Sequence, residues 1–95
     1  MDYKLAKQLK DAGFLQYGAG HNIWPIGYDS MLHDSSIEVY KPTLSELIES
    51  CGESIGSLFQ LENGWGAESE LYKLESIGNT PEMAVANLWL LLNNK

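Results

Sequence analysis

The residues of this chain with the most reactive side chains are two histidines and one cysteine. His21 and His33 stand on either side of an aromatic segment, and Cys51 is the only thiol. Zinc needs three or four ligands in a fixed geometry, and these three residues match no zinc spacing. A nucleophilic cysteine needs a base and an electropositive setting, whereas Cys51 falls on the apolar side of an expected helix. We therefore predict no metal, no cofactor and no catalytic cysteine.

Carboxylates are plentiful, and two pairs lie close in sequence, Glu46 with Glu49 and Glu68 with Glu70. General acid–base catalysis needs one carboxyl group of a pair to be shielded from water, so that the two pKa values separate. Both pairs fall on the expected solvent sides of their elements. A phosphate-binding loop is not indicated either, because the glycines of residues 18–20 lack the lysine and helix that must follow. We predict that the chain is not an enzyme.

The balance of charge argues against two classes of partner. Thirteen acidic residues stand against six lysines, arginine is missing, and the net charge is −7. Arginine is the side chain that most often donates paired hydrogen bonds to phosphates and to guanine edges. Nucleic-acid-binding domains also usually carry a basic patch. An acidic surface also repels anionic lipid. We predict partners that are neither nucleic acid nor membrane.

The length and the cysteine content suggest the domain organisation and the compartment. Ninety-five residues predict a single domain over 1–95. One cysteine cannot form an internal disulfide, and the first residues lack the apolar run of a signal peptide. No segment reaches the ~18 apolar residues of a membrane span. These features predict a cytoplasmic protein.

The expected fold is α+β, and two of its helices lie in the first half of the chain. Residues 2–12 repeat apolar side chains at helical spacing, with Asp2 as the N-cap. Residues 43–51 do the same after Pro42. Thr43 and Glu46 have the spacing of a capping box, in which each side chain satisfies the other residue's backbone N–H.

The strands are expected mainly in the second half. Residues 57–78 alternate with period two and predict a three-stranded antiparallel meander, with a type I′ turn at Asn63-Gly64 and a third strand from Leu71. A short strand is also expected over residues 36–40, pairing with one near 22–28, where Pro25 confines the strand to an edge.

The last helix is predicted to pack on one face of that meander. Thr80 is its expected cap and Pro81 its first residue. The helix is apolar almost all the way round, whereas a surface helix needs only one apolar stripe. It must be covered on more than one side, either by the rest of this chain or by a second chain, as in a homodimer.

Four residues are predicted to contact a protein partner. Trp24 and Tyr28 belong to the aromatic, glycine-containing segment, and Leu88 and Leu91 belong to the last helix. Tryptophan and tyrosine are enriched at the centres of protein interfaces. The alternative for aromatic residues is core packing, which we favour for Trp65 and Trp89.

Three segments resemble a group of small uncharacterised proteins of bacteriophages, prophages and mobile elements. They are residues 5–14 (LAKQLKDAGF), 42–52 (PTLSELIESCG) and 78–90 (GNTPEMAVANLWL), about a third of the chain. The resemblance implies no assigned activity, so no functional residue carries over. Residues 78–84 are also similar to the Gly-x-Thr-x-Glu-x-Ala stretch of HicB-type antitoxins. That weaker resemblance implies a sheet followed by a helix, and a small ribonuclease toxin as partner.

These observations leave three functions open. The first is a non-catalytic, phage-derived protein-interaction or accessory module that self-associates or binds a partner. The second is a HicB-like antitoxin whose acidic surface blocks a small ribonuclease. The third is a protein that binds a small ligand.

Overall fold

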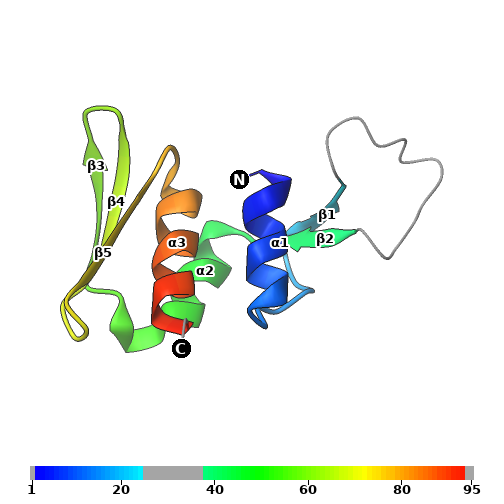
Figure 1. Ribbon diagram of the computed structural model, residues 1–95, viewed down its shortest axis with the longest axis horizontal. Coiled ribbons are helices and arrows are strands. Elements are labelled where there is room, and N and C mark those ends of the chain that lie inside the picture. The colour runs from blue at the N-terminus through cyan, green and yellow to red at the C-terminus, as the bar shows by residue number, and fades with distance from the viewer. Residues whose placement is uncertain (1, 25–37, 94–95) are drawn as a thin grey trace.

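The computed structural model describes residues 2–24 and 38–93 and shows an α+β fold, as predicted (Figure 1). A three-stranded sheet forms one outer layer, two helices lie in the middle, and a third helix with a two-stranded ribbon lies on the far side. Tyr28 and His33 lie outside the described residues. The molecule is elongated, with extents of 44 × 28 × 23 Å.

The three helices begin where local chemistry predicts. Helix α1 (Tyr3–Asp11) is capped by the carboxylate of Asp2, which accepts a hydrogen bond from Leu5 N at 2.9 Å. Helix α2 (Leu44–Cys51) starts with the predicted capping box and continues into a 3-10 turn, η2 (Gly52–Ser54). Helix α3 spans Pro81–Asn93.

Two antiparallel sheets accompany the helices. Strands β1 (His21–Ile23) and β2 (Val39–Lys41) form a two-stranded ribbon, which confirms that the two expected segments pair. Residues 25–28 and 36–37 of the expected strands, Pro25 included, lie outside the described residues. Strands β3 (Ser57–Leu61), β4 (Gly64–Ser69) and β5 (Leu74–Gly78) form the predicted meander in the order β3-β4-β5.

The predicted type I′ turn at Asn63-Gly64 is wrong. The two-residue loop is Glu62-Asn63, because Leu61 pairs with Gly64, and none of these residues has the positive φ angle that a type I′ turn requires. Gly64 belongs instead to β4, where a Cβ atom would lie 2.6 Å from the carbonyl oxygen of Gly78. The glycine is needed there for the close approach of β5.

The third strand starts three residues later than predicted. Residues 70–73 form a turn, in which the backbone N–H of Tyr72 donates to Ser69 Oγ at 3.2 Å and Lys73 adopts a positive φ of 53°. Leu71 and Tyr72 are consequently exposed in this loop rather than paired in the sheet.

Helix α3 is covered on more than one side, and this chain supplies the cover. The meander packs on one side of α3, and α2 and α1 pack on others. The contiguous core contains residues of all these elements: Leu5, Leu9, Phe14, Leu47, Cys51, Ala67, Ala84, Val85, Ala86, Leu88 and Trp89. The apolar character of α3 therefore has an explanation within one chain.

Trp89 joins the two ends of the sequence. Its side chain is only 8% exposed, and its ring meets that of Phe14 edge-on, with centroids 4.9 Å apart and an interplanar angle of 80°. This is a favoured geometry for aromatic pairs. The prediction that Trp89 is a core residue is confirmed.

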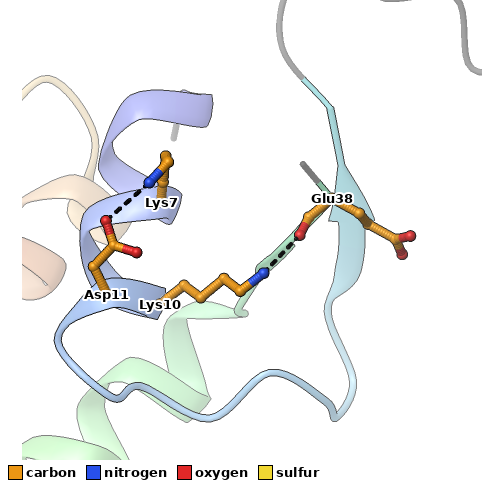
Figure 2. A network of polar contacts seen from close by, with 4 residues as sticks. All are labelled: Lys7, Lys10, Asp11 and Glu38. Atoms are coloured by element: carbon orange, nitrogen blue, oxygen red, sulfur yellow. Dashed lines mark hydrogen bonds and ion pairs between the residues drawn. The ribbon is translucent and has the colours of Figure 1, made fainter. Parts of the chain in front are cut away.

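Two lysines of α1, Lys7 and Lys10, make polar contacts (Figure 2). Lys7 pairs with Asp11 one turn later at 3.0 Å, and Lys10 Nζ donates to the backbone carbonyl oxygen of Glu38 at 3.3 Å. The Glu38 side chain points away from Lys10 and accepts instead from the Asn22 side-chain amide. Lys10 thus links α1 to the residue before β2.

Thr80→Ala is expected to lower the free energy of unfolding by about 1 kcal/mol, the usual value of an N-cap. Thr80 Oγ1 accepts a hydrogen bond from Met83 N at 3.2 Å, and alanine would leave that donor without its cap. The urea midpoint would measure the loss. Thr80→Ser keeps the hydroxyl and should stay close to the wild type, and equal midpoints for all three proteins would contradict this role.

Among residues 2–24 and 38–93, no helix is both long enough and apolar enough to cross a lipid bilayer.

Candidate functional site

The structure separates the residues predicted to contact a partner. Leu88 is 0% exposed and lies in the core, so it cannot touch a partner, and this prediction is corrected. Because α3 is apolar almost all the way round, its sequence does not show which of its side chains are exposed to solvent. Leu91, one turn later, is 42% exposed. Trp24 is half-buried and follows β1 directly, and β1 lies on the far side of the molecule from the meander (Figure 1).

The meander has one covered and one open face. Ala67 and Ser69 of β4 and Ser76 of β5 are buried toward α3, and Ser76 Oγ donates to the carbonyl oxygen of Ala84 at 2.7 Å. Side chains alternate along a strand, so their neighbours point away from α3. We call this open side the outer face; it consists of Ser57, Phe59, Leu61, Gly64, Gly66, Glu68, Glu75 and Ile77.

An apolar strip crosses the outer face at right angles to the strands. Phe59 of β3, Gly66 of β4 and Ile77 of β5 are direct neighbours in register. A Cβ atom on Gly66 would lie 2.4 Å from the Phe59 ring, so the ring occupies the space that the glycine leaves. Ile77 is 64% exposed and Leu61, beside the strip, is 41% exposed. The strip is therefore accessible to a partner.

The other end of the outer face is acidic. Glu68 of β4 is directly opposite Glu75 of β5, and Ser57 of β3 completes the row. Like charges directly opposite each other in a sheet are destabilising. The outer face thus combines an apolar half near the β3–β4 turn with a negative half at the opposite end.

A hollow of about 610 Å³ adjoins the apolar half, at the end of the sheet that meets α3. Its lining contains Leu61, Trp65, Ile77, Met83 and Asn87, together with residues 62–64 and 78–79. Asn87 Nδ2 donates to the carbonyl oxygen of Ile77 at 2.9 Å, which ties α3 to β5 here. Trp65, expected in the core, is half-buried at this site.

Strand β3 has one edge that no described strand covers. The sheet order places β4 on one side of β3 only. Helix α3 packs mainly against β5 and β4 and much less against β3. Ser57–Leu61 contains neither a charged residue nor proline, which are the usual protections of an edge strand. The backbone of β3 is thus open to pairing.

Glu46 was expected on the solvent side of α2, and the structure places it in a polar cluster instead. Its Oε1 accepts hydrogen bonds from Thr43 N at 2.9 Å and from the Tyr40 hydroxyl at 2.6 Å. That hydroxyl accepts in turn from Gly20 N at 2.6 Å. A Cβ atom on Gly18 would lie 1.9 Å from Glu46 Oε2. This cluster anchors residues 18–20 to the start of α2 and has a positioning role.

The cluster shifts two pKa values in opposite directions. The pKa of Glu46 is lowered, first by the hydrogen bond from the Thr43 backbone and next by that from the Tyr40 hydroxyl. The pKa of Tyr40 is raised, first by burial and next by its hydrogen bond to Glu46. Glu46 ionised with Tyr40 protonated is therefore the favoured state at neutral pH.

Glu46→Gln is expected to flatten the loss of stability in acid. A lowered pKa in the folded state means that ionised Glu46 stabilises the fold above its ordinary pKa of 4.5, and that this contribution disappears as the pH falls through the lowered value. Urea midpoints between pH 7 and pH 3 should fall less steeply for the glutamine variant. Glu49→Gln, at an exposed position of the same helix, is the matched control, and parallel curves for Glu46→Gln and wild type would contradict the prediction.

Cys51 is nearly buried in the core, and burial raises the pKa of its thiol to about 11. The thiol is therefore protonated near neutral pH and packs as a small apolar group. Within the described part of the chain, no three His, Cys, Asp or Glu side chains gather as a metal site would require.

The sequence contained a signal for the outer face that the four predicted contacts missed. Shifting the turn from residues 63–64 to residues 62–63 changes the cross-strand partner of each residue by two places, so the same side chains share a face. Either turn puts Phe59 and Leu61 on the side of Gly66 and Glu68, away from Ala67. Large apolar residues on the side of a glutamate and a glycine indicate an exposed apolar face.

The chain matches no protein-family model, no curated protein and no solved structure. The resemblances to phage proteins and to HicB-type antitoxins therefore stay predictions that rest on the residues quoted for them.

Proposed function

We propose that this protein is a non-catalytic protein-interaction module that binds its partner through the outer face of the meander. The observation that carries the proposal is the apolar strip of Phe59, Gly66 and Ile77 on the outer face, where Ile77 is 64% exposed and Phe59 is half-buried. Small soluble proteins usually cover such strips, and uncovered ones mark interaction sites. A cytoplasmic location and a phage or prophage origin belong to the same proposal and rest on the sequence.

Site-specific cross-linking in cells tests this function. A photoreactive phenylalanine analogue replaces Ile77 on the outer face, and a matched protein carries it at Lys4, an exposed position of α1 remote from the meander. We expect one defined cross-linked protein from position 77 and none from position 4. That protein, once purified, should bind the wild type. It should bind the Ile77→Glu variant at least tenfold more weakly, which corresponds to a loss of about 1.4 kcal/mol of binding free energy. Equal products at both positions, or none, would refute the proposal.

A HicB-like antitoxin is the second candidate. The meander followed directly by α3 on one of its faces matches the arrangement that the resemblance of residues 78–84 implies. The net charge of −7 would suit a basic ribonuclease. Co-expression separates the candidates, because an antitoxin would rescue cells from a toxic ribonuclease found by the cross-linking, and a general accessory module would not.

The hollow beside Trp65 supports the third candidate, a small-ligand-binding protein. A ligand that binds only the folded state raises the melting temperature in a saturable manner. Such a shift in a metabolite screen, lost in Trp65→Ala and kept in Leu91→Ala, would favour this candidate.

A further inference from the structure

The open edge of β3 identifies a second copy of this chain as a partner. We infer that two molecules pair antiparallel through β3, giving a continuous six-stranded sheet with a two-fold axis perpendicular to it. The inference rests on the proposed function, since it names one occupant of the meander.

The residues of β3 face one another without a charge conflict when the strand is reversed. With Phe59 on the two-fold axis, Phe59 faces its own copy on the outer side, and Ser57 faces Leu61. On the α3 side, Leu58 faces Gln60. No like charges oppose each other in this register. A second copy therefore fits the open edge of β3 without placing a charge against it, because Ser57–Leu61 is uncharged in both copies.

The acidic residues are too far from the axis to prevent this pairing. Glu68 stands on β4, so it and its copy are separated across the sheet by three strand spacings, about 14 Å. Charges at that distance are largely screened at physiological ionic strength, where the Debye length is about 8 Å. Glu62, at the end of β3, would face Gly56 of the second copy. The net charge of −7 then opposes association only at low salt.

The helices leave room for the second molecule. Helix α3 lies mainly beneath β5 and β4, on the side of the sheet opposite the outer face, so β3 is the edge it overlaps least (Figure 1). A perpendicular two-fold axis keeps both outer faces on one side and both α3 helices on the other. The two apolar strips then meet end to end at the axis, where each Phe59 ring lies over Gly66 of its own molecule.

Molar mass as a function of concentration tests the pairing. One added strand pair buries a small interface, well below the ~1,200 Å² of stable complexes, so we expect weak association. The protein concentration should therefore be varied from about 1 μM to about 1 mM. We expect the mass to rise from 10.6 kDa toward twice that value and the rise to sharpen with added salt. A mass of 10.6 kDa throughout would overturn the inference and leave β3 to a foreign strand. Ile77 lies on β5, two strands away from the open edge of β3. A monomeric protein could therefore still give the expected cross-link from position 77, so this result would leave the proposed function standing.

Charge-swap variants test the register. Phe59→Lys alone and Phe59→Glu alone should each stay monomeric, because each places like charges at the axis, and an equimolar mixture should recover the dimer. Ile77→Lys makes the same chemical change on the same face away from the edge and should dimerise like the wild type. A dimer that Phe59→Lys leaves unchanged would overturn the pairing through β3.

Hydrogen exchange of the wild type covers the case in which a Phe59 variant does not fold. Amides of β3 should gain at least tenfold protection between the dilute and the concentrated protein, and those of β5 should gain much less. Equal gains in both strands, or no gain in β3, would count against the inference.

Discussion

Trp89→Ala is expected to lower the free energy of unfolding by about 3–5 kcal/mol, the usual range for removing a large aromatic side chain from a core. Trp89 is 8% exposed, and its ring contacts that of Phe14. Alanine would leave a cavity between α1 and α3 that the backbone cannot close without moving a helix. Urea unfolding followed by far-ultraviolet circular dichroism measures the loss.

A double-mutant cycle with Phe14→Leu separates the ring contact from the cavity. The pair should show a coupling energy of about 0.5–1.5 kcal/mol, as edge-on aromatic pairs do. Tyr17→Leu, an aromatic residue 74% exposed near Phe14 in sequence, is the matched control and should show no coupling to Trp89. If Trp89→Ala unfolds at the wild-type urea concentration, Trp89 does not stabilise the core as described.

Leu88→Ala should be nearly as damaging, with a loss of about 2–5 kcal/mol. Its side chain is fully buried in the cluster that joins the meander to α2 and α1. Leu91→Ala is the matched control on the same helix, because Leu91 is 42% exposed, and its loss should stay below about 1 kcal/mol.

The comparison of Leu88 with Leu91 also tests where a partner binds. Both residues were predicted to contact a partner, but only the side chain of Leu91 is exposed to solvent. A Leu88→Ala protein with wild-type stability and weakened association would show that Leu88 is exposed in solution and would contradict the core. Weakened association in Leu91→Ala with unchanged stability would extend the interaction surface to the end of α3.

The sequence predicted the features that depend on near neighbours. The caps at Asp2, Thr43 and Thr80 each involve a side chain and a backbone N–H three residues apart. The meander was predicted from the period-two alternation of side chains along residues 57–78. Its packing against α3 was predicted because that helix is too apolar to be exposed to water on most of its sides. Local chemistry is sufficient for each of these features.

The features that were missed depend on residues far apart in the chain. The sequence predicts Gly64 as a turn residue, but the structure requires a glycine there because the backbone of Gly78 on β5 lies too close for a Cβ atom. Glu46 reads as half of a capping box, but the Tyr40 hydroxyl that shields it comes from β2. Leu88 and Leu91 are equally apolar, and only the packing of α2 and the meander around α3 distinguishes them. No local pattern contains this information.

The arrangement of elements around α3 has a consequence for how the molecule opens. The meander and α3 are contiguous in sequence, whereas α1 reaches α3 only after a separation of some seventy residues. Opening of the α1 end would release the Phe14–Trp89 contact and the ribbon while the meander, α2 and α3 keep most of their contacts. Proteins often open in such contiguous units below the free energy of complete unfolding. The amides of α1 should therefore exchange through a partial opening that spares β4, and among the described residues those beside α1 should be cut by proteases before those of the meander.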